Sequence, residues 1–272
     1  MNAFKIGMAG VLAIALTIAA ARIAAAGGPT GWGYPSCLPV TAFPANINAP
    51  GVYCLGFKYI DFPLPKGVLI TISSDNVVFD LNGATLDGTP KGNAFSYGIM
   101  AYNRRNVTIR NGTLRGFNYG IYLYTPLGYV NTRVRPSHHI LVENMRLIEN
   151  RTSGMYVIAY DSVIRKNHII QTGGSADPGL AASTWGMIVA GDGTRILDND
   201  ITNTHVNTAY GGGTTTGIYL AGGLNFTIVN NRINEADFGI YGGNGNWGKF
   251  RDNVTTAVGV PFTGGTNLGN NN

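Results

Sequence analysis

Charged residues are scarce in this chain. Only 12% of the 272 residues are Asp, Glu, Lys or Arg, whereas an average soluble domain has about 25%. Because 44% of the residues are hydrophobic, this scarcity excludes a disordered polyelectrolyte. The formal net charge is +5 at pH 7 and is not concentrated in one segment, so we expect no nucleic-acid partner.

The composition also disfavours a helical bundle, because 39 glycines interrupt the chain and glycine is a poor helix former. The abundant Val, Ile and Tyr instead favour strands, and Gly, Asn and Thr favour the turns between them. The length allows one domain or one repeat array with a sizeable core. The composition therefore predicts an all-β chain.

Long hydrophobic runs are absent except at the beginning. Residues 1–26 combine a positive charge at Lys5, an apolar run over 6–21 and small residues at 24–26. This pattern is typical of a secretory signal peptide; an uncleaved anchor is the alternative. We expect a secreted or periplasmic protein that is not held in a membrane after cleavage.

The chain has only two cysteines, Cys37 and Cys54. In an oxidising compartment they are expected to form a disulfide, and two buried free thiols are the alternative. No Cys-x-x-Cys pair or neighbouring histidine accompanies them, so we expect no metal site and no cofactor.

One pattern recurs from Val68 to Val260: an alternating strand, an asparagine, a short apolar step, a turn, and a second strand that opens with glycine. The second strands open at Gly98, Gly120, Gly154, Gly186, Gly217 and Gly239. Repeats of this length with several short strands each indicate a solenoid. Leucine-rich and helical repeats do not fit the residue pattern, whereas a parallel β-helix does.

Stacked coils would place equivalent residues above one another. We expect a hydrogen-bonded asparagine ladder at one corner, since Asn suits such turns and its amide can donate to the next Asn. Its predicted members are Asn82, Asn111, Asn144, Asn167, Asn199, Asn231 and Asn253. The preceding residues Arg110, Glu143, Lys166 and Asp198 alternate in sign and predict a ladder of opposite charges.

The chain is expected to contain a signal peptide (1–26), a disulfide-stapled N-terminal cap (27–65), the β-helix (66–262) and a flexible tail (263–272). Residues 27–65 are rich in proline and hold both cysteines, whereas the tail is rich in Gly and Asn. Terminal coils of a solenoid need caps because their edges are exposed. We expect a monomer.

Residues 51–55, 80–83 and 106–112 together resemble the opening of exported right-handed parallel β-helix proteins. That group includes pectate-lyase-like enzymes and periplasmic NosD-type proteins. The resemblance extends over residues 51–260 and implies an all-β, right-handed parallel β-helix of about seven coils. It is specific for the fold and unspecific for the chemistry.

Four segments are longer than the repeat requires: 88–95, 125–137, 172–184 and 203–215. Long loops on a rigid scaffold often carry binding sites, although these could also be tolerated insertions. We include Asp177 and Tyr210, which lie in two of these loops, among the candidate substrate-binding residues.

The second strands carry an aromatic pattern two residues after each glycine. These positions are Met100, Tyr122, Tyr156, Ile188, Tyr219 and Tyr241. Alternation along a strand predicts that they point outward. An exposed aromatic stripe indicates an interaction surface, and tyrosine suits sugar binding. In the resembled enzymes the comparable sheet forms the saccharide cleft. The alternative is that loops cover the stripe.

Catalytic motifs are weak. The acidic, histidine and Arg-Ile-Lys motifs of polygalacturonases are missing, as are the Asp-Pro-His motif of alginate epimerases and a calcium cluster. A Tyr/His pair could still perform β-elimination on an acidic glycan, with His205 as base and Tyr219 as acid, although His205 could simply be a surface-loop residue.

The sequence thus predicts an exported protein that binds or processes a polysaccharide. The alternatives are a non-catalytic glycan-binding or structural protein of the cell envelope, and a periplasmic maturation factor.

Overall fold

The computed structural model describes residues 37–61, 66–89, 95–125, 136–175, 183–206, 213–243 and 247–272. The predicted signal peptide, residues 1–26, lies outside this part of the chain. All described residues belong to one unit, Ser36–Asn272. None of them forms a helix that is long and apolar enough to cross a membrane.

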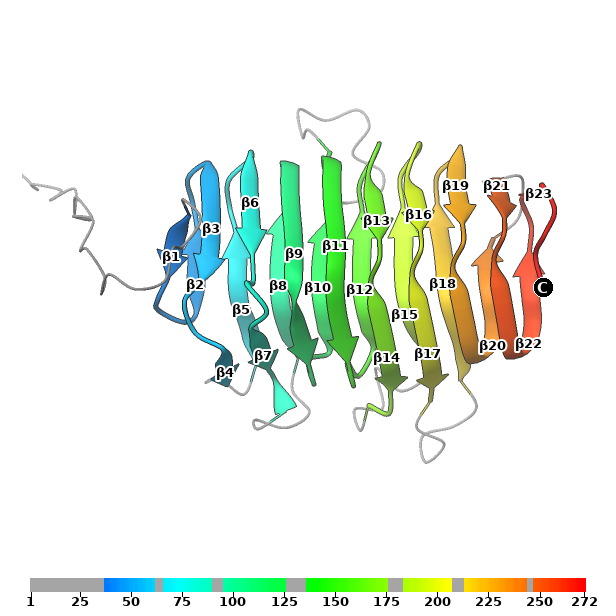
Figure 1. Ribbon diagram of the computed structural model, residues 1–272, viewed down its shortest axis with the longest axis horizontal. Coiled ribbons are helices and arrows are strands. Elements are labelled where there is room, and N and C mark those ends of the chain that lie inside the picture. Colours follow the sequence, from blue (N-terminus) through cyan, green and yellow to red (C-terminus); the bar gives the residue numbers. More distant parts are fainter. Residues whose placement is uncertain are drawn as a thin grey trace, which may run out of the picture. The chain divides into compact units, whose positions relative to one another are not determined.

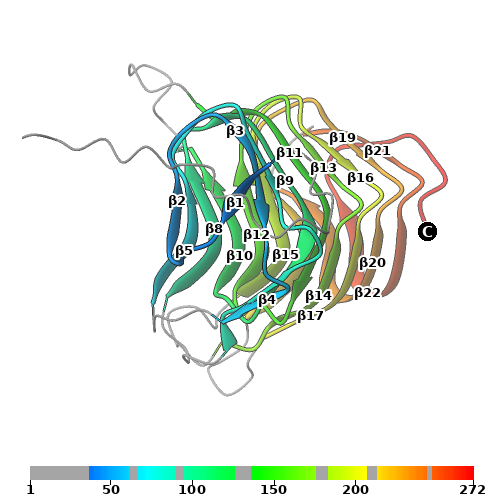
Figure 2. The same ribbon diagram turned by 60° about the vertical axis from the view of Figure 1, so that its left-hand side comes forward.

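The described strands form a parallel β-helix whose coils follow one another across Figure 1. Figure 2 shows the coils one behind another, with strands separated by bends. Each strand pairs in parallel with its equivalents in the neighbouring coils. This confirms the predicted fold class, and it sorts the strands into three stacked faces.

The first face, which we call the aromatic face, contains β2 (Ala45–Ile47), β5 (Gly67–Ile72), β8 (Ser96–Tyr102), β10 (Tyr119–Tyr124), β12 (Ser153–Ile158), β15 (Ser183–Ala190), β18 (Thr214–Gly222) and the ends of β20 (Arg232–Gly242) and β22 (Val254–Thr263).

The second face, which we call the charged face, contains β1 (Leu38–Val40), β3 (Gly51–Leu55), β6 (Val77–Asp80), the first halves of β9 (Arg105–Arg115) and β11 (His138–Ile148), and then β13 (Val163–Arg165), β16 (Arg195–Leu197), β19 (Phe226–Val229), β21 (Gly248–Arg251) and β23 (Thr266–Asn267).

The third face contains β4 (Tyr59–Asp61), β7 (Thr85–Asp87), the second halves of β9 and β11, β14 (His168–Gly173), β17 (Asp200–His205) and the first halves of β20 and β22.

The interior is filled by aliphatic side chains that stack from coil to coil. Ile99, Ile121 and Met155 lie in one such column on the aromatic face, and all three are fully buried. Burying one side chain of this size contributes about 2 kcal/mol. Because the same position is apolar in every coil, a shift of one residue would expose the whole column.

The corners use residues in the left-handed region of backbone space. At the corner between the third and aromatic faces, Gln171, Asn203 and Glu235 have φ values of 53°, 55° and 60°. At the corner between the charged and third faces, the equivalent values are 51° for Asn82 and 56° for Asp198. Asn and Asp tolerate this conformation best, which explains their frequency in the sequence.

A column of glycines begins the strands of the aromatic face. A Cβ on Gly120 would lie 2.7 Å from the carbonyl oxygen of Gly154, and a Cβ on Gly186 would lie 2.6 Å from that of Gly217. Each glycine is therefore required by the close approach of the next coil rather than by its own backbone angles.

The predicted asparagine ladder is present, and its buried part consists of the last four predicted members, Asn167, Asn199, Asn231 and Asn253, with Asn271 in addition. Each of the four buried asparagines donates from Nδ2 to the Oδ1 of the next asparagine, over 2.9–3.0 Å. The last acceptor is Asn271 in the C-terminal segment. Each ladder amide also donates to a backbone carbonyl oxygen one coil earlier, as Asn199 does to Ile164.

The other three predicted members are Asn82, Asn111 and Asn144. Asn144 Nδ2 donates to Asn111 Oδ1 over 3.4 Å, so this pair makes the predicted contact at the surface, whereas Asn82 donates to the Leu55 carbonyl oxygen instead. These three asparagines themselves hold the left-handed corner, with φ values of 51°, 61° and 52°, and lie outside the buried ladder. In later coils the left-handed residue is the preceding one, Lys166 or Asp198 for example. That shift of one residue turns the asparagine inward.

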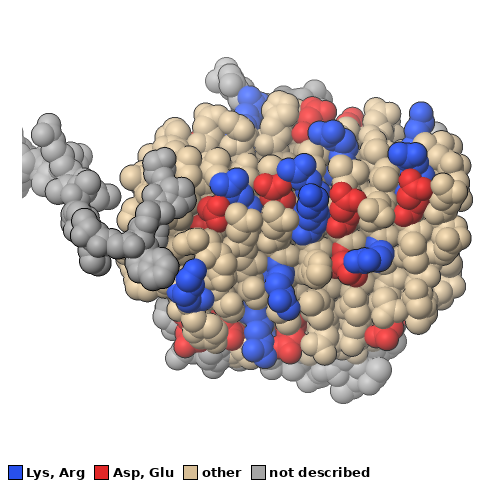
Figure 3. All heavy atoms as spheres, in the orientation of Figure 1, with Lys and Arg blue, Asp and Glu red and all other residues tan. Residues whose placement is uncertain are grey.

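The charge ladder is displaced by the same shift. Its register is Asp80, Arg110, Glu143 and Arg165 rather than one continuing through Lys166 and Asp198. Arg110 Nε lies 2.8 Å from Asp80 Oδ2, and Arg165 Nη2 lies 2.6 Å from Glu143 Oε2. Figure 3 shows such rows of basic and acidic side chains on this side of the molecule.

The N-terminal region contains the predicted disulfide, Cys37–Cys54. In the chain-entropy model a loop of this size contributes about 3 kcal/mol. The β-helix, which was expected to begin at residue 66, begins earlier. β1, β2, β3 and β4 already pair with strands of later coils, so residues 38–61 of the expected cap form a coil themselves. Pro39 fits there because β1 is an edge strand.

The C-terminal segment, expected to be a flexible tail, is hydrogen bonded to the preceding coil. β23 pairs with β21, and the Asn272 amide donates to the Asn253 carbonyl oxygen over 3.0 Å. Asn271 also accepts two hydrogen bonds from Asn253. Residues 266–272 thus extend the stack instead of departing from it.

Replacing Asn199 by Ala tests the ladder. Asn199 exchanges side-chain bonds with both neighbouring asparagines and accepts from the Asn167 amide, so its loss leaves several buried polar groups without partners. We expect a loss of about 3 kcal/mol in the free energy of unfolding, measured by urea denaturation. Asn234→Ala is the matched control, since Asn234 is only half-buried, and it should cost under about 1 kcal/mol. Equal losses would contradict the ladder.

Candidate functional site

The aromatic face holds the predicted column in the predicted register. Tyr122 pairs with Met100 on one side and with Tyr156 on the other. Ile188 lies between Tyr156 and Tyr219, which pairs in turn with Tyr241. The flanking residues Ile121 and Leu123 are buried, so the tyrosine side chains point outward and are half-buried.

A second aromatic column lies beside the first, one residue before each glycine. Tyr97, Tyr119, Trp185 and Phe238 occupy it, with smaller residues in between. Strict alternation along the strand would send these residues inward. Instead the glycine and the following residue are both buried, as at Gly98 and Ile99. The kink brings both aromatic columns to the outer surface, and the recurring aromatic-Gly pair was the signal that could have revealed it.

Six tyrosines on β8, β10 and β12 form what we call the tyrosine cluster: Tyr97, Tyr102, Tyr119, Tyr122, Tyr124 and Tyr156. Tyr122 and Tyr156 stack with ring centroids 4.8 Å apart, and Tyr97 and Tyr119 stack at 5.5 Å. Since the rings stack on one another along the coils, they present mainly edges and hydroxyls to a ligand.

The environment raises the pKa values of four phenols of the cluster, those of Tyr97, Tyr119, Tyr122 and Tyr156. Burial, with smaller contributions from Tyr97 and Tyr156, raises the pKa of Tyr119 to about 12. Burial also raises the pKa of Tyr122, and the nearby phenols Tyr156 and Tyr97 add to the effect. A phenol with a raised pKa is a hydrogen-bond donor at neutral pH and a poor general base.

A cleft follows the tyrosine cluster on the same face. It has a volume of about 320 Å³ and is lined by Trp185, Thr214, Thr216, Tyr219, Phe238 and Tyr241. We call it the tryptophan cleft. Tyr219 stacks on Tyr241 at 5.7 Å and lies 6.3 Å from the Trp185 ring, both centroid to centroid. The cleft thus combines ring surfaces with threonine hydroxyls.

His205, the candidate base, lies at the end of β17 with its side chain exposed. It lines a cleft of about 400 Å³ together with Thr215, Glu235 and Asp237. Asp237 Oδ2 accepts hydrogen bonds from the Thr215 amide and hydroxyl, at 2.9 and 3.0 Å. Tyr219, the candidate acid, lines the tryptophan cleft instead. The two predicted catalytic residues therefore line different clefts.

Two predicted site residues, Asp177 and Tyr210, lie outside the described residues. The central parts of the four long loops lie outside them too. The roles assigned to His205, Tyr219, Asp177 and Tyr210 therefore stay predictions. Among the residues that are described, no group of three or more His, Cys, Asp or Glu side chains is arranged to hold a metal ion.

A buried carboxylate lies at the corner where residues 88–95 leave the third face. Asp87 is 4% exposed and accepts hydrogen bonds from Tyr59 Oη at 2.7 Å, from the Thr89 amide at 2.8 Å and from the Thr89 hydroxyl. Burial raises its pKa, but these hydrogen bonds outweigh burial, so the pKa is lowered overall. All its contacts hold the turn in place, which indicates a structural role.

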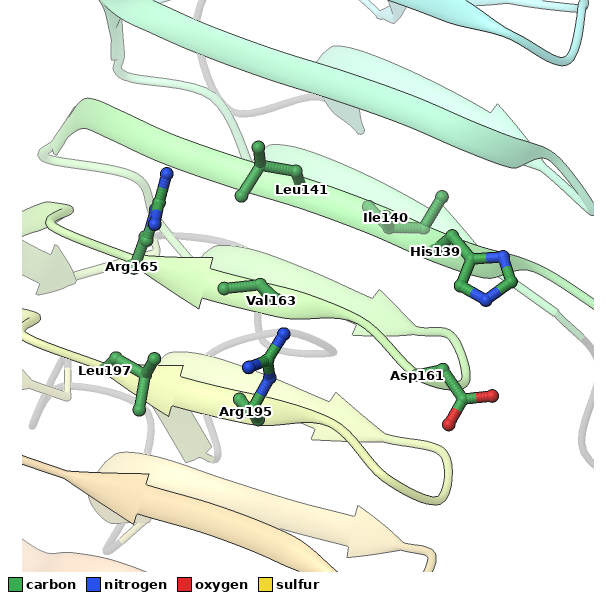
Figure 4. A pocket seen from close by; sticks show the side chains of 8 residues that line it. All are labelled: His139, Ile140, Leu141, Asp161, Val163, Arg165, Arg195 and Leu197. Carbon is green, nitrogen blue, oxygen red and sulfur yellow. The ribbon is translucent and has the colours of Figure 1, made fainter.

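The charged face has a cleft of its own, of about 280 Å³. Figure 4 shows Arg165 and Arg195 projecting from neighbouring strands beside Leu141, Val163 and Leu197, with His139 and Asp161 at the corner. Arg165 is bound to Glu143. The cleft has an apolar floor and one arginine engaged in an ion pair, an arrangement that stabilises the stack of coils.

Similarity to solved structures is confined to the fold. An alginate lyase from Paenibacillus sp. str. FPU-7 is 12% identical, with a TM-score of 0.48 over 84% of this chain and 86% of that one. The catalytic domain of a GH87 alpha-1,3-glucanase in complex with nigerose is 13% identical, with a TM-score of 0.25 over 90% of this chain and 70% of that one. No curated protein sequence matches the chain.

A family description matches most of the sequence directly. The model of the right handed beta helix region matches residues 97–272, a range that begins at β8 and includes both the tyrosine cluster and the tryptophan cleft. The stacked parallel strands agree with it in every coil of that range. The chain belongs to the right-handed β-helix family.

Proposed function

We propose that this protein binds a polysaccharide along its aromatic face, with the glycan chain running across successive coils. The observation that carries the proposal is the double aromatic column on consecutive coils. An outward stripe of this kind is unusual on a soluble protein and marks an interaction surface. Aromatic side chains that combine apolar rings with hydroxyls suit sugars, which have apolar and hydroxyl-bearing surfaces themselves.

The hydroxyls of the tyrosine cluster support the proposal. In the described part of the chain, the hydroxyls of Tyr97, Tyr119, Tyr122 and Tyr156 form no hydrogen bond with another residue, and none of these oxygens is among the buried polar atoms without a partner. These four side chains are half-buried rather than fully buried. Each can donate one hydrogen bond to a sugar hydroxyl and accept another.

The periodicity of the face supports a polymeric ligand. Neighbouring coils lie about 4.8 Å apart, and each coil contributes an equivalent outward position. A repeating ligand makes the same contact at each coil, so weak contacts add along the chain. A small ligand would use only one segment of such a face.

Export is part of the proposal. The Cys37–Cys54 disulfide is typical of oxidising compartments outside the cytosol, and polysaccharides of cell walls and matrices occur there. Residues 1–26 have the pattern of a secretory signal. We propose a secreted or periplasmic location.

Binding without cleavage is the function that the described geometry favours. Elimination by His205 and Tyr219 requires both groups at one sugar, whereas they line separate clefts. The phenols of Tyr119 and Tyr122 have raised pKa values and are unsuited to act as bases. The lyase hypothesis and the maturation-factor hypothesis gain no support from a described contact.

The double variant Tyr122→Ala/Tyr156→Ala tests the proposed binding surface. It removes the closest stacked pair of the cluster, and we expect at least a tenfold loss of affinity, or about 1.4 kcal/mol. A glycan array identifies the ligand, and calorimetry measures its affinity. Tyr53→Ala is the control, because Tyr53 lies on the charged face. The proposal fails if the parent protein binds no glycan or if the double variant binds as tightly as the parent.

The raised phenol pKa values predict an alkaline limit to stability. Tyr119 ionises with a pKa of about 12 in the folded chain and with a pKa of about 10 when unfolded. Its stabilising contribution is complete below about pH 10 and declines as the pH rises to about 12, because only the unfolded chain then ionises freely. The melting temperature, measured by thermal unfolding, should be constant from about pH 7 to about pH 9 and should fall steeply above about pH 10.

Tyr119→Phe should make that alkaline decline shallower, since Phe cannot ionise. Tyr53→Phe is the matched control and should leave the profile unchanged. A profile for Tyr119→Phe that is identical to that of the parent protein would show that this phenol does not titrate as described.

A further inference from the structure

The strands of the aromatic face carry no formal charge. Residues 68–72, 96–102, 119–124, 153–158, 183–190, 214–222, 238–242 and 260–263 include no Asp, Glu, Lys or Arg. The other two faces hold the charged strand residues, such as Arg110, Glu143 and Arg165. Charged and uncharged strand residues therefore lie on different faces of the β-helix. The lack of charge is a property of the aromatic face and does not simply reflect the low charge of the whole chain.

An uncharged face discriminates against acidic glycans. A polymer of uronic acids carries one carboxylate per sugar, and moving carboxylates from water onto half-buried tyrosine rings costs free energy unless a cation compensates. Proteins that recognise carboxylates supply arginine or lysine for this purpose. The described strands of the aromatic face supply neither.

Three charged residues that the structure describes at the margins of this face, Asp237, Arg104 and Arg151, have interactions of their own. Asp237, which precedes Phe238, accepts hydrogen bonds from the Thr215 amide and hydroxyl. Arg104, which follows β8, donates to the carbonyl oxygens of Tyr102 and Ser73, at 2.7 and 2.8 Å, and lies 3.9 Å from Asp75. Arg151, which precedes β12, is half-buried; burial lowers its pKa, and the nearby Asp87 carboxylate partly opposes that shift. None of the three residues lies within the aromatic columns.

The polar groups on the aromatic face are neutral hydroxyls, which can both donate and accept a hydrogen bond. The phenols of Tyr97, Tyr119 and Tyr156 are protonated at neutral pH, because a free phenol has a pKa of about 10 and burial raises the pKa values of these three further. In the tryptophan cleft the polar partners are the hydroxyls of Thr214 and Thr216. A hydroxyl both donates and accepts, which is also the hydrogen-bonding pattern of an uncharged sugar.

The cleft provides the apolar part of such a site. Its volume of about 320 Å³ lies within the range of small-ligand sites, about 300–1,000 Å³. Trp185, Tyr219 and Phe238 supply ring surfaces at its walls, and an apolar sugar face can pack against them.

Resting on the function proposed above, we propose that the ligand is a neutral polysaccharide, one without carboxylate or sulfate groups. Recognition uses the phenol and threonine hydroxyls together with ring contacts, and it requires no cation. Affinity should then be nearly independent of salt, because no ion pair forms on binding.

Matched glycan pairs test this proposal. Polygalacturonate is compared with its fully methyl-esterified form, and alginate with carboxyl-reduced alginate, beside neutral glucans, xylans and mannans. We expect a neutral glycan to bind most tightly, each neutral partner to bind at least tenfold more tightly than its acidic counterpart, and the affinity to change less than twofold between 0.05 and 0.5 M NaCl. Tighter, salt-sensitive binding of the acidic partners would overturn the neutral ligand while leaving polysaccharide binding intact. Binding of no glycan would overturn both proposals.

A lysine placed on the face provides the converse test. Met100 is half-buried in the same column as Tyr122, and Met100→Lys should raise the affinity for the acidic partner by at least threefold at low salt. Thr108→Lys, on the charged face, is the matched control and should have no effect. Thr71→Lys, in the Met100 column, replaces the first variant if that one does not fold. No gain from a folded variant would contradict the account of charge exclusion.

Discussion

Parallel pairing of one coil with the next is the constraint on which the rest of this structure depends. Each residue lies beside the equivalent residue of its neighbours, so every local preference is repeated along the whole molecule. Buried asparagines satisfy one another in a ladder, and glycines permit the close approach of successive backbones. The residue type at each position of such a column is restricted by the residues in the neighbouring coils as much as by its own strand.

The same constraint explains how the aromatic face, the proposed binding surface, can arise. The glycine column forces two consecutive buried positions at the beginning of each strand of the aromatic face, and the residues on either side of them then project outward. Tyr97 and Met100 illustrate the pair on β8, as Phe238 and Tyr241 do on β20. Aromatic residues at these positions form a continuous surface, whereas charges gather on the other faces. We therefore connect the fold to the proposed ligand through one repeated kink.

Much of this was predictable from the sequence, because a solenoid makes long-range structure periodic. The fold class, the Cys37–Cys54 disulfide and the outward Tyr122–Tyr156 column follow from pattern alone. The errors in the asparagine and charge ladders share a physical cause, a shift of one residue within a repeat. Asn144 and Asn167 look equivalent in the sequence, yet the left-handed corner falls on Asn144 in one coil and on Lys166 in the next. The aromatic residue before each glycine was missed because simple alternation does not include the kink. The prediction that His205 and Tyr219 act together rests on their residue types alone, because residue spacing does not show which side chains meet across a corner.

The central claim is that a glycan covers the aromatic face and not the others. Hydroxyl-radical footprinting with mass spectrometry measures it most directly, because oxidation reports the solvent exposure of individual tyrosine and tryptophan side chains. In the presence of the tightest-binding glycan, oxidation of Tyr122, Tyr156 and Trp185 should fall severalfold, whereas oxidation of Tyr53 and Tyr59 should not change. Unchanged oxidation at the first three residues, or equal protection of all five, would contradict the account.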